Sequence, residues 1–341
     1  KGIQTRRLWK APSQRLSRYH KPPKVQSPVR LGMTLKPVIK HFDPFILAQQ
    51  FVSEVASNLQ GLPRVPHVAG IIAGDDKPSL AYARRTMAKF QEVGMTYDLI
   101  KVNRLDVEAA IETANDNPNI HGIFTYFPIF ANQQDDYLRN LVDYRKDIEA
   151  GSQFWTQKLY HNDRFSGPGA PTKKAVLPCT PLAIVKLLAE LKLQSPSTSE
   201  QPLPQRSMTG ETVTIFNRSE VIGRPLAVML SNDGARVLSF DEHGPMEFID
   251  AEPRELTIDR QQALACSDIV ITGVPSESFR KISAREIKTT AVCINFSSIA
   301  NFSVDMSSHE GIYIPRIGPL TVAMCMRNTV RLFSHFHRGQ H

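Results

Sequence analysis

"TVTIFNRSEVIGRPLAVML", residues 212–230, is the stretch that decides the fold of this chain. It reads as a strand over 212–216, a polar turn, and a helix from Pro225, because proline favours the first turn of a helix. A helix that begins at the carboxyl end of a parallel strand points its amide N–H groups and its positive dipole end at whatever lies above the sheet. Phosphate suits that position, so the stretch predicts a nucleotide site.

Side chains in and after this turn fit the same interpretation. Ser219 can donate a hydroxyl, Arg218 can pair with a phosphate, and Gly223 allows close backbone approach. Asp241 ends the next predicted strand, 18 residues after Gly223, where dinucleotide enzymes hold the adenosine ribose hydroxyls. A carboxylate there repels a 2′-phosphate, which favours NAD over NADP. The turn lacks G-x-G-x-x-G, however, and Asp241 could instead simply cap a turn.

Strands and helices alternate on both sides of this stretch. The expected strands are at 67–74, 96–102, 120–128, 235–240, 268–275 and 291–296, and the expected helices are at 45–59, 79–90, 106–115 and 180–193. Such alternation predicts an α/β protein with two three-layer domains, the second beginning near residue 180. Two polar stretches, 194–208 and 242–262, are interpreted as insertions of unassigned role.

Positive charge is concentrated at the start of the chain. Residues 1–42 hold eleven of the 41 Lys and Arg residues and no acidic residue, which leaves 30 basic against 33 acidic residues elsewhere. A near-neutral body argues against nucleic-acid binding, which needs a basic face on the fold itself. We interpret residues 1–32 as a disordered basic extension, with a mitochondrial transit segment and a nucleic-acid tail as the alternatives.

Cysteine usage and hydropathy exclude other classes. No run of 18 apolar residues occurs, so no transmembrane helix is expected. The four cysteines are far apart, with no C-x-x-C pair and no Cys/His spacing that suits zinc, so no metal site is expected. Free thiols favour a reducing compartment. The expected location is therefore cytoplasmic, or mitochondrial if residues 1–32 are a transit segment.

Six segments, taken in order, carry a more specific resemblance. They are "YFPIFANQQDDYL" (126–138), "RKDIE" (145–149), "LPCTPLAIVKLL" (177–188), "NRSEVIGRPLAVMLSNDGARV" (217–237), "DIVITGVP" (268–275) and "IGPLTVAM" (317–324). Over residues 67–330 the chain resembles the methylenetetrahydrofolate dehydrogenase/cyclohydrolase family, most closely its fungal, monofunctional NAD-dependent branch. The resemblance implies a folate-binding catalytic domain (33–180 plus 318–341), a Rossmann-type NAD-binding domain (181–317), an active-site cleft between them and a homodimer.

The resemblance also implies a role for individual residues. The expected catalytic residues are Tyr82, Thr86, Tyr126 and Glu149. The expected substrate-binding residues are Ser79, Tyr82, Glu149, Pro319 and Thr321. The expected NAD-binding residues are Asn217, Arg218, Ser219, Gly223, Arg224, Pro225, Asp241, Thr272, Gly273, Val274 and Pro275. Tyr82 is expected to stack on the folate ring system, and Glu149 to accept hydrogen bonds from the pterin amino and ring N–H groups, with Ala150 replacing the family's glycine after it.

The helix "SLAYARRTMAKF" (79–90) decides which reaction is expected. Bifunctional family members read S-x-x-Y-x-x-x-K, and their lysine drives the cyclohydrolase step. Here Thr86 stands at the lysine position, one turn from Tyr82 on the same helix face, and Tyr126 replaces the glutamine that partners the lysine. Threonine offers no proton chemistry near neutral pH, whereas hydride transfer is mainly a problem of positioning.

These residues predict NAD-dependent oxidation of 5,10-methylenetetrahydrofolate to 5,10-methenyltetrahydrofolate, without cyclohydrolase activity, in one-carbon and purine metabolism. The alternatives are a bifunctional enzyme with residual hydrolase activity through Lys89 or a water chain, a non-catalytic folate/NAD-binding relic, and a nucleic-acid binder acting through residues 1–32. The expected partners are tetrahydrofolate derivatives and a second copy of the chain, with no nucleic acid and no membrane.

Overall fold

Two mainly parallel β-sheets organise the computed structural model, which describes residues 42–167, 173–194 and 207–339. All of these residues belong to one compact unit, Pro37–His341. The strand order is β2-β1-β3 in the first sheet and β10-β9-β8-β4-β5-β6-β7 in the second. The expected α/β class with two parallel sheets is therefore confirmed. The extension 1–32 and most of the polar stretch 194–208 lie outside the described residues.

The first sheet is parallel and carries helices on both faces. Its central strand β1 (His67–Ala73) pairs with β2 (Thr96–Val102) and β3 (Gly122–Thr125). Alternate residues of β1 belong to two separate buried clusters, one shared with α2 (Lys77–Glu92) and the other with α3 (Val107–Asp116). The period-2 alternation of a strand therefore places one helix on each face of this sheet.

Strand β3 is shorter than the expected range 120–128. It ends at Thr125, and the chain then leaves the sheet. The buried carboxylate of Asp135, at the start of α4 (Gln133–Leu141), accepts hydrogen bonds from the amides of Ile129, Phe130 and Ala131. Those amides are satisfied by a side chain rather than by a neighbouring strand, so the apolar run continues as a loop.

The second sheet has a parallel core with an antiparallel extension. The parallel strands are β4 (Thr212–Phe216), β5 (Arg236–Asp241), β8 (Ile269–Thr272), β9 (Val292–Asn295) and β10 (Ile312–Ile314). Next to β5 lie the antiparallel strands β6 (Gly244–Ile249) and β7 (Glu252–Glu255). The polar stretch 242–262, to which the sequence assigned no role, mostly forms this sheet edge and the start of α8 (Arg260–Cys266).

The quoted stretch 212–230 folds as a strand, a turn and a helix, as predicted. The helix α7 begins at Gly223, two residues before the expected Pro225, and ends at Asn232. It contacts β4, β5 and β6, while α8 contacts β4. Short helical turns complete the chain; they are η1 (Arg104–Asp106), η2 (Ala284–Glu286), η3 (Val304–Ser308) and η4 (Phe333–His337).

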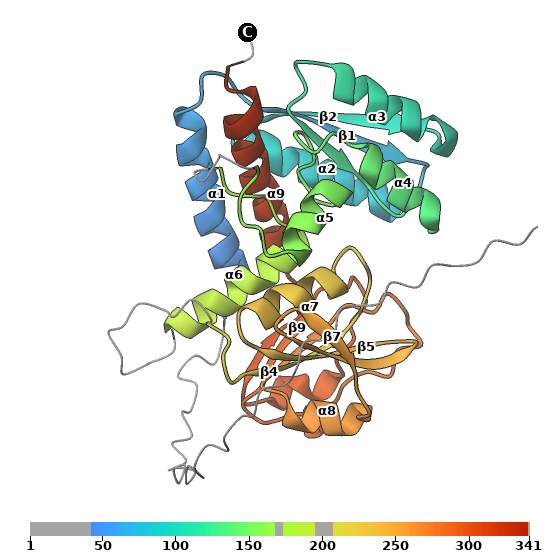
Figure 1. The fold of residues 1–341 in the computed structure, drawn as a ribbon, viewed down its shortest axis with the longest axis vertical. Coiled ribbons are helices and arrows are strands. Elements are labelled where there is room, and N and C mark those ends of the chain that lie inside the picture. The colour runs from blue at the N-terminus through green and yellow to red at the C-terminus, as the bar shows by residue number, and fades with distance from the viewer. Residues whose placement is uncertain (1–41, 168–172, 195–206, 340–341) are drawn as a thin grey trace, which may run out of the picture. The chain divides into compact units, whose positions relative to one another are not determined.

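Helix α9 (Gly318–Leu332) joins the end of the chain to its beginning. It packs against α1 (Pro44–Gln60), and the two helices lie side by side in Figure 1. Arg327 of α9 forms an ion pair with Glu54 of α1, with 3.0 Å between nitrogen and oxygen. The amide of Asn328 donates hydrogen bonds of 2.9 Å to the carbonyls of Ile148 and Leu177. The last helix is thus held by segments from the first half of the chain.

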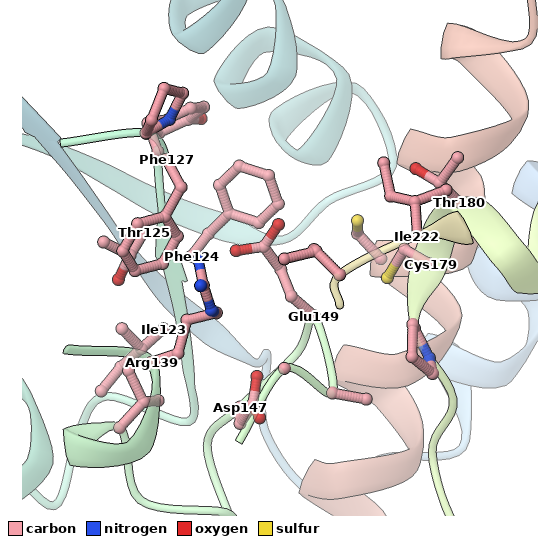
Figure 2. Close-up of a pocket in the computed structure, with 18 of the residues that line it drawn as sticks. Ile123, Phe124, Thr125, Phe127, Arg139, Asp147, Glu149, Cys179, Thr180 and Ile222 are labelled. Carbon is pink, nitrogen blue, oxygen red and sulfur yellow. The ribbon is translucent and has the colours of Figure 1, made fainter. Parts of the chain in front are cut away.

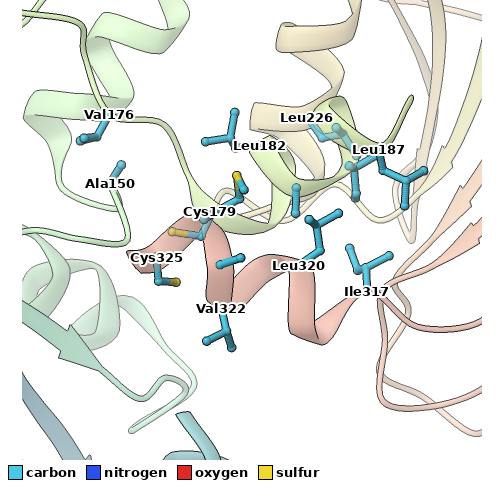
Figure 3. Close-up of a cluster of buried hydrophobic side chains, with 14 of the residues drawn as sticks. Ala150, Val176, Cys179, Leu182, Leu187, Leu226, Ile317, Leu320, Val322 and Cys325 are labelled. Carbon is cyan, nitrogen blue, oxygen red and sulfur yellow. The ribbon is translucent and has the colours of Figure 1, made fainter. Parts of the chain in front are cut away.

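Helices α6 (Cys179–Gln194), α7 and α9 meet in one buried apolar cluster. Figure 3 shows Cys179 and Leu187 of α6, Leu226 of α7 and Leu320 of α9 within it. Close packing of three helices in one core fixes how the elements around the two sheets approach one another. No helix in the described part of the chain is long and apolar enough to cross a membrane.

Candidate active site

A cavity of about 1070 Å³ opens beside the carboxyl end of the first sheet. Its walls come from α2, the end of β3, the loop 147–151, the first turn of α6, the turn 220–222 and α9. Figure 2 shows the side chains of Phe124, Glu149, Cys179 and Ile222 around it. Segments from both halves of the chain therefore enclose a space that can hold a ligand the size of a folate head group.

Helix α2 supplies one wall of this cavity. Its first turn is capped by Asp76, whose carboxylate accepts a hydrogen bond of 2.9 Å from the Ser79 amide. Ser79 and Tyr82 line the cavity, and the Tyr82 side chain is 39% exposed. Thr86, one turn further on, is only 1% exposed and does not line the cavity.

The Thr86 hydroxyl is buried and makes no hydrogen bond of normal geometry. It still lies close enough to Tyr82 and Tyr126 to lower the pKa of each phenol slightly, although burial has the larger effect and raises both pKa values well above the ordinary range. Both phenols therefore stay neutral at physiological pH. Lys89 points elsewhere, since it is exposed and forms an ion pair of 2.7 Å with Glu92.

The loop 147–151, which follows α4, carries two acidic side chains of the cavity lining, Asp147 and Glu149. Burial, followed by the nearby Asp147 carboxylate, raises the pKa of Glu149 to about 8, against the opposing effects of Arg139 and of the Thr125 amide. Asp147 is also buried, and its carboxylate accepts a hydrogen bond of 2.8 Å from the Ser152 amide. Figure 2 shows both acids on this loop together with Arg139.

Lys146 and Ala150, which lie close to Glu149 in the sequence, have structural roles. The Lys146 ammonium donates hydrogen bonds to three backbone carbonyls at the end of α3, at 2.6–3.0 Å. It therefore satisfies the terminal acceptors of that helix and does not face the cavity. Ala150 is fully buried and has a φ of +54°, a left-handed conformation that disfavours a Cβ atom.

The turn between β4 and α7 is organised by its own hydrogen bonds. The Asn217 amide donates to the Gly273 carbonyl at 2.9 Å, and its oxygen accepts from the amide and the hydroxyl of Ser219. The Ser219 oxygen in turn accepts from the Ile222 amide at 3.3 Å, close to the start of α7. A Cβ at Gly223 would lie 2.0 Å from the Asn217 carbonyl oxygen, so only glycine allows this close approach.

Arg218 and Asp241 bind each other. The Arg218 guanidinium forms a two-pronged ion pair with the Asp241 carboxylate, and it also donates to the carbonyls of Ser239 at 3.1 Å and Gly244 at 2.8 Å. This arrangement does not favour the expected pairing of Arg218 with a phosphate, because most N–H groups of its guanidinium already have acceptors. Asp241 still stands at the end of β5, partly exposed.

The remaining expected residues lie at the end of β8 and in the first turns of α7 and α9. Thr272 is buried and donates to the Asn295 side chain at 3.1 Å, while a Cβ at Gly273 would collide with the Phe296 ring. Val274 and Pro275 follow them, and Arg224 and Pro225 lie in the first turn of α7. On α9, Thr321 lines the cavity and Pro319 does not.

The structure thus brings one group of the expected residues to a single cavity. The cavity lining includes Ser79, Tyr82, Tyr126, Glu149 and Thr321. The expected nucleotide residues lie outside that lining, at the carboxyl ends of β4, β5 and β8 and in α7. Sequence reasoning missed further lining residues, namely Arg85, Arg104, Arg139, Asp147, Thr180, Ile222 and Cys325.

Two chemical properties of the cavity stand out. No lysine among the described residues lines it. The described part of the chain also has no group of three or more His, Cys, Asp or Glu residues placed to hold a metal ion. The cavity-lining groups that act electrostatically on the Tyr82 phenol are Cys325, Glu149 and Tyr126.

Comparison with known proteins gives a consistent assignment for both halves. Residues 45–149 match the family model "Tetrahydrofolate dehydrogenase/cyclohydrolase, catalytic domain", and residues 178–337 match "Tetrahydrofolate dehydrogenase/cyclohydrolase, NAD(P)-binding domain". The chain is 37% identical to a methylenetetrahydrofolate dehydrogenase [NAD(+)] of Schizosaccharomyces pombe, over 85% of this chain and 91% of that protein. It is 38% identical to a protein of the same name from Dictyostelium discoideum, over 85% and 92% of the two chains.

A solved structure is similar along nearly its whole length. The NAD-dependent 5,10-methylenetetrahydrofolate dehydrogenase of Saccharomyces cerevisiae superposes with a TM-score of 0.79 at 35% sequence identity, covering 87% of this chain and 98% of that one.

Proposed function

Because the chain belongs to the tetrahydrofolate dehydrogenase/cyclohydrolase family, we propose that it oxidises 5,10-methylenetetrahydrofolate to 5,10-methenyltetrahydrofolate with NAD and does not hydrolyse the methenyl product. The folate-binding part would comprise residues 33–180 and 318–341, and the NAD-binding part residues 181–317. A homodimer is proposed as well, and sedimentation of the purified chain tests it.

The cavity residues bind and orient the folate in this proposal. Tyr82 offers a partly exposed ring on which the pterin stacks, and Ser79 and Thr321 add hydroxyl groups on the cavity walls. Glu149 accepts hydrogen bonds from the pterin amino and ring N–H groups, for which it must be ionised. Stacking on Tyr82 and hydrogen bonding to Glu149 constrain the pterin from two directions. Together these contacts fix where the reacting methylene carbon lies.

The ends of β4, β5 and β8 suit an NAD molecule. Bound NAD supplies a nicotinamide ring that accepts a hydride. Gly223 lets the backbone come close at the start of α7, and Asp241 presents a carboxylate where ribose hydroxyls are held. The Arg218 side chain is 9% exposed and committed to Asp241, so little capacity remains for a 2′-phosphate. This pairing supports NAD rather than NADP.

The absence of lysine from the cavity lining, within the described part of the chain, carries the proposal that hydrolysis is missing. Hydrolysis of a methenyl bridge needs an activated water and a group that moves a proton. Thr86 stands at the position of the lysine of bifunctional family members, and Tyr126 stands at the position of the glutamine that partners it. Burial raises the pKa of the Tyr126 phenol, which therefore stays neutral. Lys89 cannot substitute, because its ammonium is held at the surface by Glu92. Hydride transfer needs none of these proton transfers.

A spectrophotometric assay on the purified chain tests both parts. Methylenetetrahydrofolate is supplied with NAD or with NADP, and the reduced nicotinamide and the methenyl product are followed together. In a second assay, preformed methenyltetrahydrofolate is incubated without cofactor, with and without the enzyme. The matched control is Lys89→Ala, which removes the one lysine on the helix 79–90.

We expect turnover with NAD, little with NADP, and one methenyl formed for each NADH. Preformed methenyl should decay at the same rate with and without the enzyme. Faster decay in the presence of the enzyme would overturn the missing hydrolase step, and loss of that decay in Lys89→Ala would assign it to Lys89. If neither cofactor is reduced, the chain is a binding relic of its family rather than an enzyme.

A further inference from the structure

Two tyrosines from opposite edges of the first sheet meet over its central strand. Tyr97 belongs to β2 and Tyr126 directly follows β3, and β1 lies between those strands. Adjacent strands are about 4.8 Å apart, so the backbones of β2 and β3 are separated by roughly 10 Å. The two phenol oxygens are nevertheless only 2.7 Å apart, and both tyrosines are buried.

Gly70 makes this contact possible. It stands in β1 opposite Leu99 of β2 and Phe124 of β3, midway along the path between the two tyrosines. A Cβ atom at this position would lie 2.3 Å from the Tyr97 hydroxyl oxygen and 2.5 Å from a carbon of its ring. The Tyr97 ring therefore crosses the central strand through the space that a side chain would otherwise fill.

The Tyr126 hydroxyl has a second, longer contact, with the carbonyl of Ala83 in α2 at 3.5 Å. Either hydroxyl can be the donor in the 2.7 Å contact between the two phenols. When Tyr126 gives its single proton to Ala83, Tyr97 donates to Tyr126. Burial raises the pKa of both phenols, so both remain neutral. The chain of contacts runs from β2 across β1 to Tyr126 and on to the residue after Tyr82.

Tyr126 connects this chain to the cavity. Its ring packs edge-on against Tyr82, with 6.1 Å between ring centroids, and against Phe124 at 4.6 Å. Tyr82 and Tyr126 both line the cavity, whereas Tyr97 is absent from the lining among the described residues and is 2% exposed. The hydrogen bond to Tyr126 is therefore the direct contact between the Tyr97 hydroxyl and the cavity lining.

We propose that Tyr97 is a positioning residue that holds Tyr126, and through it the Tyr82 ring, in the geometry needed to bind and orient the folate. The Tyr97 hydroxyl fixes where the Tyr126 ring stands, and Gly70 fixes where that hydroxyl can reach. This inference rests on the proposed folate-binding function of the cavity. It adds a residue of β2, outside the cavity lining, to the groups that determine substrate geometry.

The test is a double-mutant cycle with Tyr97→Phe and Tyr126→Phe. Tyr97→Phe removes only the hydroxyl and keeps the ring that packs against Phe90 at 5.1 Å, so the fold should survive. Loss of one buried hydrogen bond between neutral groups predicts an approximately 3- to 10-fold drop in kcat/KM for the folate substrate, with the KM for NAD unchanged. In the Tyr126→Phe background, Tyr97→Phe should have no further effect, because the hydrogen bond that links its hydroxyl to the cavity lining is already gone.

The matched control is Tyr313→Phe, which removes the hydroxyl of a half-buried tyrosine in β10 of the other sheet and should leave both KM values unchanged. Unaltered folate kinetics in Tyr97→Phe would overturn the inference. Effects that multiply in the double variant, or that raise the two KM values equally, would do so as well. If Tyr97→Phe does not fold, Tyr126→Phe breaks the same hydrogen bond from the cavity side and must show the same loss.

Failure of the proposed function gives a different result. In that case the wild-type chain itself shows no turnover, and calorimetric titration with tetrahydrofolate replaces the kinetic assay. Weaker tetrahydrofolate binding by Tyr97→Phe than by the wild type and Tyr313→Phe then supports the positioning role. Equal affinities of all three proteins for tetrahydrofolate refute it.

Discussion

Ionisation of Glu149 should control folate binding across the physiological pH range. Burial and the Asp147 carboxylate raise its pKa to about 8 in the free protein, so below that pH most molecules carry a neutral acid. The pterin presents N–H donors, which need the ionised form. Protonation therefore competes with substrate, and kcat/KM, which reports groups of the free enzyme, should fall as the pH drops below 8.

The expected magnitude follows from the pKa. At pH 6, two units below it, about 1% of the Glu149 side chains are ionised, so kcat/KM for the folate should be about 100-fold below its plateau near pH 9. Binding at pH 7 should release about 0.9 proton per folate, because that fraction of the acid must ionise. Initial rates at saturating NAD give the profile, and calorimetry of tetrahydrofolate binding in two buffers of different ionisation enthalpy gives the proton count.

Matched variants identify the titrating group. Glu149→Gln should flatten the profile at a low level and abolish proton release. Asp147→Asn should move the break to lower pH, since it removes the neighbouring negative charge. Glu220→Gln should leave the break unchanged, because Glu220 also lines the cavity but is paired with Arg224. A wild-type profile that is flat from pH 6 to 9, or a break that survives in Glu149→Gln, would refute the reasoning.

Three further changes have defined outcomes. Asp241→Asn removes the carboxylate that engages Arg218, so the ratio of NAD to NADP turnover should fall by about 10-fold or more; an unchanged ratio contradicts the assignment. Burial, followed by the Arg64 charge, lowers the pKa of His121 to about 4 in the folded state against 6.5. The unfolded chain thus binds the proton more readily, and up to about 3 kcal/mol of unfolding free energy should be lost as the pH falls from 6.5 to 4. Denaturant titrations of wild type and His121→Gln over this pH range measure the loss. If the unfolding free energies of both proteins depend on pH with the same slope, the reasoning is wrong. Ala150→Gly relieves left-handed strain but removes a buried methyl, so the unfolding free energy should change by less than about 1 kcal/mol. Ala150→Val, whose branched side chain fits neither the φ of +54° nor the packed site, should lose about 2 kcal/mol or more, and equal stabilities of the two variants would exclude strain there.

Sequence periodicity predicted the elements that have a buried face. The strands β1, β2, β4 and β8 and the helices α1, α2 and α6 appear within a few residues of their expected ranges. These segments follow the apolar spacing of a half-buried helix or a buried strand, which is a local property of the chain. On the helix 79–90, Ser79 and Tyr82 line the cavity as expected, because they share one helical face, whereas Thr86, which was expected to be catalytic, is buried outside the lining.

Strand β7 shows why periodicity failed elsewhere. All four of its residues, Glu252–Glu255, are exposed, and Pro253 is among them. An edge strand without a buried face carries no alternating pattern, and proline argues against a strand unless it lies at an edge. Only the pairing with β6 reveals it.

Pairings between distant side chains were also beyond the sequence. From the sequence, Arg218 was expected to pair with a phosphate and Asp241 with ribose hydroxyls. In the structure they form an ion pair with each other, because β5 lies beside β4. Tyr97 lies in the strand expected at 96–102, but its contact with Tyr126 depends on the register that brings Gly70 between them. Such contacts follow from sheet order, which local spacing does not specify.

The position of α9 also constrains when the protein can first become functional during its synthesis. Thr321 and Cys325 of this helix form part of the cavity wall, and Arg327 reaches back to Glu54. A ribosome releases these residues after every other segment of the cavity wall, so a face of α1 stays uncovered until α9 has emerged. Nascent or prematurely terminated chains would lack a finished folate cavity and would offer that bare helix to chaperones and proteases instead.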